Sequence, residues 1–478
     1  MPRIGVAIGA LLLVLASTLP AAATGDRPAI ASPARGGKGA PTVATTGFDL
    51  ASVGYEQSEY FLTGSARSYR STRPLSPDGK WSVVPDGLAD YKTRIVVYRP
   101  IDPQRFDGTV MVEWLNVTGG LDAGANWTMG HVQEIREGMA WVGVSAQQVG
   151  VRALQQDDPD RYRSLRHPGD QFAYDIYAQA GAAARRATAP VLGGLSARHV
   201  IAVGESQSAF FLTSYVNALA PGAKVFDGFL IHSRAAFAAP LDGSSALRGG
   251  ATARIRTDLR VPILVFTTET DLTTLGYFRA RQPDSRRFRD WEVAGTSHYD
   301  AYGLGIAQQD TGDGSSDGPF FDALITSSPS ASPGFDCAEP INAGPTTYVM
   351  RSAIRDLNRW VTTGTPPPHA RRIQESDTEP GRIAVDTNGN ARGGIRTAPV
   401  DVPVATLSGT GQSGAGFCIL FGTTTPFDAK KLAALYPDHA TFVEAWSAAT
   451  DRAVRAGFIL PEDATHIKAA AAQSTIGS

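Results

Sequence analysis

HVIAVGESQS, residues 199–208, is the stretch that decides the fold: a β-branched apolar run leads into a serine flanked by small residues. A largely apolar segment of helical character, Ala209–Leu219, follows directly. A serine on a strand-to-helix turn is held in a strained conformation, so the residues two positions away on either side have to be small. Gly204 meets this demand, and Ser208 stands where the pattern G-x-S-x-G has glycine. The pattern predicts that Ser206 is a nucleophile at the carboxyl edge of a sheet; the alternative is a serine that only caps the helix.

Two further strands downstream end in groups that suit such a serine. The expected strand 261–268 runs into Glu269-Thr270-Asp271, and the expected strand 288–293 is followed by a turn that ends in His298. A serine, an acid and a histidine in this order, each just past a strand, predict a Ser206–Asp271–His298 triad. Glu269 and Asp271 are two residues apart and share one face of an extended chain, so Glu269 stays open as the acid. We favour Asp271, because it lies a few residues into the turn.

Backbone N–H groups beside Ser206 are the candidates for an oxyanion hole. Gln207 begins the expected helix, where the backbone N–H and the helix dipole favour negative charge. A second donor is expected in the loop NVTGG, residues 116–120, which follows the strand 109–115. Val117 is our choice for this donor. His232 also ends a strand, but it precedes the acid, and we expect a structural role for it.

The rest of the chain alternates short apolar runs with helical stretches. This alternation predicts an α/β fold: a mostly parallel sheet with helices on both faces and a C-terminal extension or lid. We expect the core to span residues 47–304. A loop rich in Gly, Asp, Ser and Pro should cover 305–335, and a core helix plus a lid-like extension should cover 336–478.

The N-terminus has the order of a secretory signal peptide. Arg3 precedes a 16-residue apolar run, Ile4–Leu19, and small residues follow at 21–23. The alternative is a membrane anchor, but a spanning helix needs about 20 residues. We therefore expect residues 1–23 to be removed and residues 24–46 to form a flexible leader. The mature protein is then secreted or periplasmic.

Composition excludes several classes of protein. The chain has 44 Lys+Arg against 46 Asp+Glu and a formal net charge of −2, which argues against nucleic acid as a partner. Two cysteines are too few for a disulfide-dense scaffold or a cysteine zinc site. In an exported protein we expect Cys337 and Cys418 to form a disulfide; two buried thiols are the alternative. No metal and no organic cofactor are implied, no stable membrane insertion is expected, and the oligomeric state stays open.

A cover for the site is expected from the C-terminal part. The segment between His232 and Val261 looks too short and polar for a helical cap, so we assign this role to residues 365–460. Arg392 and Arg396, within ARGGIR, could meet a substrate carboxylate; the alternative is that they are solvated.

These motifs together resemble the α/β-hydrolase superfamily and, within it, the secreted bacterial family of alpha/beta hydrolase domain proteins. The resemblance rests on VEWLNVTGG, GVSAQQVGV, YDIYAQAG, VGESQS, TETD, GTSHYD, GGIRTAPVDVPVA and LFGTTTPF, which span about residues 110 to 430. It implies the α/β-hydrolase fold and a serine-hydrolase mechanism, with small carboxylic esters as substrates. Two alternatives stay open: an acyltransferase or lactonase with the same triad, and a catalytically silent fold that binds a ligand.

Overall fold

The computed structural model describes residues 28–245, 249–326 and 335–478. The expected signal peptide, residues 1–23, lies outside the described residues. Within the described part, no helix is long and apolar enough to cross a membrane.

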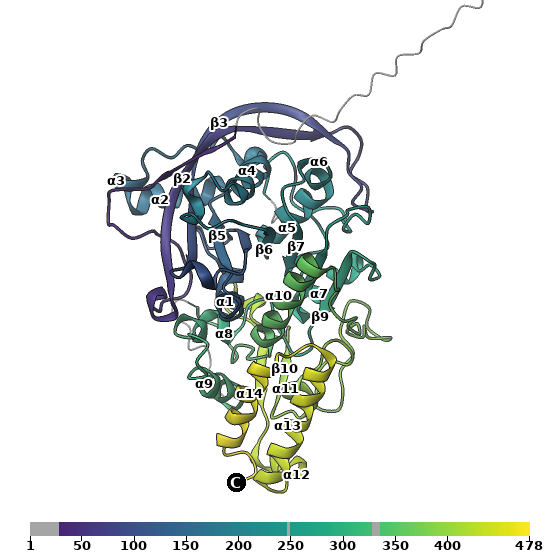
Figure 1. Ribbon diagram of the computed structural model, residues 1–478. Helices are drawn as coiled ribbons and strands as arrows, with labels where there is room; N and C mark the ends of the chain where they lie inside the picture. Colours follow the sequence, from purple (N-terminus) through teal and green to yellow (C-terminus); the bar gives the residue numbers. More distant parts are fainter. Residues whose placement is uncertain (1–27, 246–248, 327–334) are drawn as a thin grey trace, which may run out of the picture.

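A nine-stranded sheet forms the centre of the molecule, in the order β1-β2-β3-β5-β4-β6-β7-β8-β9 (Figure 1). From β5 to β9 every neighbouring pair is parallel, as the sequence predicted, whereas β1, β2 and β3 pair antiparallel. The parallel strands are buried along almost their whole length, which explains the largely apolar sequences of β4, β5, β6, β7 and β8. Strand β9, FRDWE, is also buried but carries three charged residues. The strands are β1 Ile30–Pro33, β2 Tyr55–Ser71, β3 Val83–Pro100, β4 Thr109–Trp114, β5 Ala140–Val144, β6 His199–Glu205, β7 Gly228–His232, β8 Ile263–Thr267 and β9 Phe288–Glu292.

The antiparallel edge of the sheet was not predicted from the sequence. Strand β3 has 18 residues, and it pairs with the 17-residue β2 over most of its length. Outside short apolar runs such as residues 95–98, polar residues interrupt both strands, so the sequence does not mark their full length. The expectation of a flexible leader at residues 24–46 was wrong for part of that segment, because Ile30–Pro33 form β1 at the edge of the sheet. This strand is held by backbone pairing, and three of its four side chains are exposed, so it has little sequence signature.

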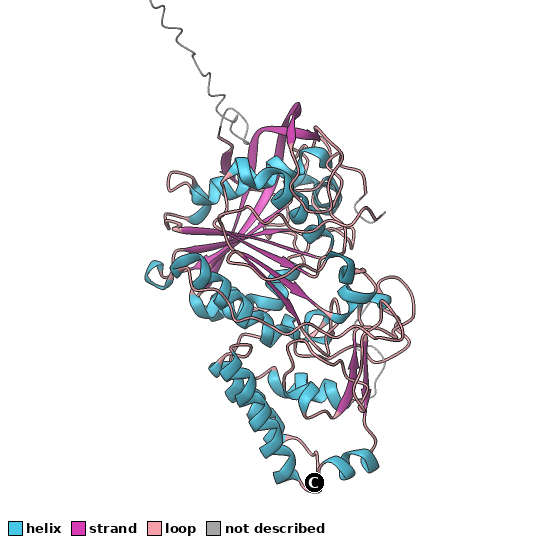
Figure 2. Ribbon diagram, turned by 90° about the vertical axis from the view of Figure 1, so that its right-hand side faces the viewer, coloured by secondary structure: helices cyan, strands magenta, loops and turns pink. Residues whose placement is uncertain are grey.

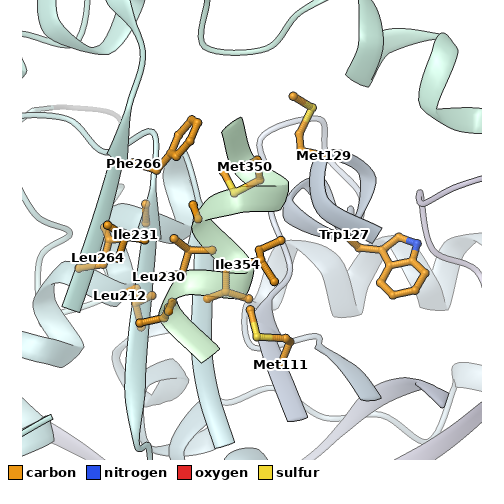
Figure 3. Close-up of a cluster of buried hydrophobic side chains, with 14 of the residues drawn as sticks. Met111, Trp127, Met129, Leu212, Leu230, Ile231, Leu264, Phe266, Met350 and Ile354 are labelled. Carbon is orange, nitrogen blue, oxygen red and sulfur yellow. The ribbon is translucent and has the colours of Figure 1, made fainter. Parts of the chain in front are cut away.

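Helices cover both faces of the sheet (Figure 2). Helices α1 and α10 pack together on one face, and α4 and α5 pack on the other. Ile354 of α10 lies among apolar side chains of the strands (Figure 3), and a Cβ at Gly130 of α1 would be only 2.3 Å from its Cδ1. Glycine at position 130 therefore permits the close approach of these two helices. The helices of the core are α1 Ala125–Glu137, α2 Gln148–Asp157, α3 Pro159–Tyr162, α4 Ala173–Arg185, α5 Gln207–Ser214, α6 Ala220–Ala223, α7 Glu269–Thr273, α8 Ala301–Leu304 and α10 Thr346–Thr363.

A C-terminal extension lies at one end of the molecule, drawn in yellow at the bottom of Figure 1. It packs against α9, Asp317–Ile325, which lies inside the stretch expected to be a loop. That expectation was wrong because Phe320, Phe321 and Leu324 form a buried helical face within a segment whose flanks are rich in Gly and Ser. The extension consists of α11 Ala398–Asp401, β10 Ala405–Ser408, β11 Thr423–Pro426, α12 Ala429–Leu435, α13 His439–Ala456 and α14 Pro461–Gln473.

A buried ion cluster joins the last helix to the core. Asp463 of α14 is fully buried, and its Oδ1 accepts hydrogen bonds from Nη2 of Arg136 at 2.9 Å and from Nη1 of Arg351 at 3.1 Å. Arg351 also donates to Asp310 Oδ2 at 2.7 Å. One carboxylate thus connects α14 to α1 and α10.

We expect Asp463→Asn to lower the free energy of unfolding by about 2 kcal/mol, because the buried Arg351 then keeps Asp310 as its one carboxylate partner in the cluster and a hydrogen bond to a charged group contributes about this much. Urea unfolding monitored by circular dichroism measures the change. Glu462→Gln is the matched control, because Glu462 is the exposed neighbour on the same helix. Equal stability of the two variants would contradict the assigned role of the cluster.

Candidate active site

The turn between β6 and α5 holds Ser206 in a strained conformation at positive φ, with φ 56° and ψ −123°. Such a backbone is costly for a residue with a side chain, and it is found where the fold enforces it. A Cβ at Gly204 would lie 2.9 Å from the carbonyl oxygen of Ser208, so glycine is required there. The Ser208 hydroxyl accepts from the Glu205 N–H at 3.0 Å and donates to the Glu205 carbonyl at 2.7 Å. The serine that replaces the last glycine of the G-x-S-x-G pattern therefore stabilises the turn through two hydrogen bonds to the backbone of Glu205.

Ser206, His298 and Asp271, which follow β6, β9 and β8, form one hydrogen-bonded chain at the carboxyl edge of the sheet. His298 Nε2 lies 2.6 Å from Ser206 Oγ, and His298 Nδ1 lies 2.6 Å from Asp271 Oδ1. The other oxygen of Asp271 accepts the Thr268 N–H at 2.7 Å within a capping box at the start of α7. With Nδ1 protonated toward Asp271, Nε2 is free to accept the Ser206 proton. This is the geometry that a general base and its nucleophile need.

The environment of His298 favours its charged form. Burial lowers its pKa, but the Asp271 carboxylate, the hydrogen bond to it and the Glu205 carboxyl outweigh this effect, so the pKa of His298 is raised above its ordinary value of 6.5. Ser206 is 9 % exposed and His298 is 4 % exposed. A proton transfer between them is therefore largely screened from bulk water.

Glu269, the alternative acid, faces away from the histidine. Its carboxylate accepts the Gly295 N–H at 2.6 Å and the Gly409 N–H at 2.9 Å. Burial raises the pKa of Glu269 to about 7, although the two hydrogen bonds act to lower it. Of the two acids that the sequence left open, the structure brings Asp271 to His298, and Glu269 joins the histidine loop to the C-terminal extension.

Gln207 and Val117 lie on the two segments that meet at Ser206. Gln207 is the first residue of α5, where backbone N–H groups have no intrahelical acceptor. Its side-chain amide donates to Gln147 Oε1 at 2.9 Å. Val117 is buried, and the residue before it, Asn116, donates from Nδ2 to the Glu205 carbonyl at 3.1 Å. No described residue accepts a hydrogen bond from the Val117 N–H.

Glu205 lies inside the serine motif, but the sequence suggested no role for it. Its Oε1 is 3.5 Å from His298 Nε2, and its Oε2 accepts from Asn116 Nδ2 at 3.0 Å. Burial raises the pKa of Glu205 to about 7. The position of an acidic residue directly before the serine, at a strand end, could have indicated that Glu205 belongs to the site.

His232 is fully buried at the end of β7, and burial lowers its pKa to about 3. It is therefore neutral, and neither ring nitrogen has a hydrogen-bond partner among the described residues. Its ring packs edge-on against Phe266.

The C-terminal extension lies against the loops that carry Asp271 and His298. Thr270 Oγ1 donates to the Gly409 carbonyl at 2.6 Å. Asn342, just before α10, links the histidine loop to the extension, because its Nδ2 lies 3.2 Å from the carbonyl oxygens of both Gly295 and Ser408. A Cβ at Gly422 would lie 2.8 Å from Cβ of Ser297, so the segment before β11 touches the residue preceding His298. The extension thereby supports both loops.

The expected disulfide between Cys337 and Cys418 is present. Both residues are buried in a small apolar cluster with Ile341 and Phe421, and Tyr299, the neighbour of His298, packs against this cluster. The bond closes 81 residues of chain beside the histidine loop.

The two arginines considered for a substrate carboxylate do not converge on the site. Arg396 forms ion pairs with Asp401 at 2.7 Å and with Asp386 at 3.2 Å, and Arg392 is exposed. The charge of Arg396 is thus already compensated within the extension.

The fold and this site define the class of the protein. Its parallel sheet, its strained serine after β6 and its acid and histidine after β8 and β9 are the arrangement of an α/β-hydrolase. A family model described as alpha/beta hydrolase domain matches residues 27–469, and the chain belongs to this family.

Several solved structures are similar to parts of the chain. The esterase Est22 has 12 % identity and a TM-score of 0.29, over 51 % of this chain and 73 % of that one. A serine hydrolase without lid from Xanthomonas campestris, XC6422, has 14 % identity and a TM-score of 0.28, over 49 % and 85 %. A fungal esterase from Rhizomucor miehei has 11 % identity and a TM-score of 0.26, over 48 % and 74 %. No curated protein matches the chain in sequence.

Proposed function

We propose that this protein is an exported serine hydrolase that cleaves small carboxylic esters through an acyl-enzyme. The observation that carries the proposal is the pair of 2.6 Å contacts of His298, one to Ser206 and one to Asp271. These two contacts join a strained serine to a base, and the base to a buried acid. It is the arrangement that activates a hydroxyl for attack on a carbonyl carbon.

In the first half-reaction, Ser206 Oγ attacks the ester carbonyl while His298 Nε2 accepts the hydroxyl proton. Asp271 holds Nδ1 protonated and stabilises the imidazolium that forms. The tetrahedral intermediate collapses, the bond to the alcohol oxygen breaks, and His298 returns the proton to the leaving alcohol.

In the second half-reaction, a water molecule loses a proton to His298 and attacks the acyl-enzyme carbonyl. The bond to Ser206 Oγ breaks, Ser206 regains its proton from His298, and the carboxylic acid leaves. The N–H groups of Gln207 and Val117 donate to the oxyanion of both tetrahedral intermediates, where the start of α5 also favours negative charge.

We also propose export, with removal of residues 1–23. The charged, apolar and small-residue order of the first residues supports it. The disulfide between Cys337 and Cys418 fits an oxidising compartment. The C-terminal extension, which contacts the acid and histidine loops, is proposed to cover the acyl pocket.

A fluorophosphonate probe tests the proposal. We expect covalent labelling of the purified protein, with the adduct on the peptide that contains Ser206 by mass spectrometry. A panel of p-nitrophenyl esters and lactones, assayed with and without added alcohol, then separates hydrolysis from acyl transfer and lactone opening. No labelling and no turnover would favour the catalytically silent fold.

The pH profile of kcat/KM tests the role of His298. The base must be neutral to accept a proton, and the pKa of His298 is raised, so activity should fall as pH decreases through a value above 6.5. Initial rates on the best p-nitrophenyl ester from pH 5 to 9 measure this limb. A flat profile, or an active His298→Ala variant, would remove His298 from the mechanism.

A further inference from the structure

A second carboxyl group flanks the base on the side of the nucleophile. Glu205 Oε1 lies 3.5 Å from His298 Nε2, the same nitrogen that lies 2.6 Å from Ser206 Oγ. The mechanism above uses Asp271 on Nδ1 and leaves this carboxyl unassigned. Glu205 itself is 3 % exposed, so solvent screens its charge poorly.

Asn116 holds this carboxyl in place. Its Nδ2 donates to Glu205 Oε2 at 3.0 Å and to the Glu205 carbonyl at 3.1 Å. Its Oδ1 accepts the Thr118 N–H at 2.8 Å, which orients the amide so that Nδ2 points at Glu205. Because the Asn116 amide binds Oε2, the other carboxyl oxygen of Glu205, Oε1, faces His298.

The charged groups around Glu205 and His298 come from the ends of four strands. The groups that act on Glu205 are His298, Asp271 and Glu113, and the buried hydroxyl of Tyr299 also faces it. His232, which is neutral, is the remaining titratable neighbour of His298. Among the described residues, His298 is the basic group within ion-pair distance of Glu205.

We propose that Glu205 is a positioning residue that, in its ionised form, stabilises the protonated imidazole of His298 during acyl transfer. The proposal rests on the proposed serine-hydrolase function. Asp271 and Glu205 then flank the imidazolium from both nitrogens. The negative charge of Glu205 acts on the Nε2 proton when that proton has left Ser206, and it strengthens the base.

A purely structural role is the competing explanation, in which Glu205 only joins the loop after β4 to the serine turn. Both roles predict some loss of activity when Glu205 is replaced. Only an electrostatic role predicts a change in the titration of His298. Glu205→Gln separates them, because glutamine keeps the size and an acceptor for Asn116 but removes the charge.

The experiment follows the His298 imidazole signal of the resting protein by NMR in histidine-labelled samples across pH. We expect Glu205→Gln to lower the pKa of His298 by about one unit, as loss of a nearby opposite charge does. The acid limb of kcat/KM should move to lower pH by a similar amount, and its plateau should fall about tenfold. Glu205→Asp, which keeps the charge on a shorter side chain, should give a smaller shift in the same direction.

Glu134→Gln is the matched control. Glu134 is also a fully buried glutamate, and its carboxyl has no hydrogen-bond partner among the described residues and no contact with His298. An unchanged His298 pKa in every folded Glu205 variant would overturn the proposal, as would an equal shift in Glu134→Gln. The NMR titration needs no turnover, so its result does not depend on the labelling of Ser206 that tests the proposed function. Failure of one proposal can therefore be distinguished from failure of the other.

Discussion

Ser206→Ala is expected to lower kcat/KM on p-nitrophenyl esters by about 10⁴-fold or more and to abolish fluorophosphonate labelling. The reason is that Oγ is the atom that forms the acyl bond, and no other described hydroxyl lies within hydrogen-bond distance of His298 Nε2. The fold should survive, because alanine removes only this oxygen. Unchanged circular dichroism and thermal unfolding check that the loss is chemical.

Ser208→Ala is the control for this variant. The Ser208 hydroxyl bonds both backbone groups of Glu205 and none of the groups that react, so its loss should loosen the turn and lower activity far less. Retained turnover in Ser206→Ala together with an inactive Ser208→Ala would show that the nucleophile is wrongly assigned.

Asp271→Asn is expected to lower kcat/KM by about 10⁴-fold, a loss that comes from the wrong tautomer of the histidine. Asp271 accepts two hydrogen bonds, from His298 Nδ1–H and from the Thr268 N–H, one on each carboxylate oxygen. Asparagine has one acceptor oxygen, so one of these bonds is lost. If its NH₂ group faces Nδ1, the proton is held on Nε2, and the imidazole can no longer accept the proton of Ser206.

Glu269→Gln is the matched comparison, since Glu269 is equally buried two residues away and bonds the backbone of Gly295 and Gly409 instead of a histidine. Its replacement should weaken one backbone bond and reduce kcat/KM by no more than about tenfold, as the loss of one neutral hydrogen bond would. Measuring kcat/KM of both variants at one pH decides between the acids. A larger loss in Glu269→Gln would reassign the role.

Strong local signals made the core of the fold and the order of the site predictable. The buried parallel strands β6, β7 and β8 have continuous apolar runs, and the serine turn has its small flanking residues within one short motif. The long strands β2 and β3 were largely missed because their residues alternate with polar ones. Helix α9 was missed because its flanks have the composition of a loop.

The amino-acid sequence by itself determined the class of fold and narrowed the site to Ser206, His298 and two acids, Glu269 and Asp271, because each lies just past an expected strand. The tertiary structure decided which acid faces the histidine and placed Glu205 beside Nε2. It also decided that the C-terminal extension braces the acid and histidine loops. These are contacts between residues 26 or more positions apart in the chain, and their distances depend on how the strand ends and loops pack against one another.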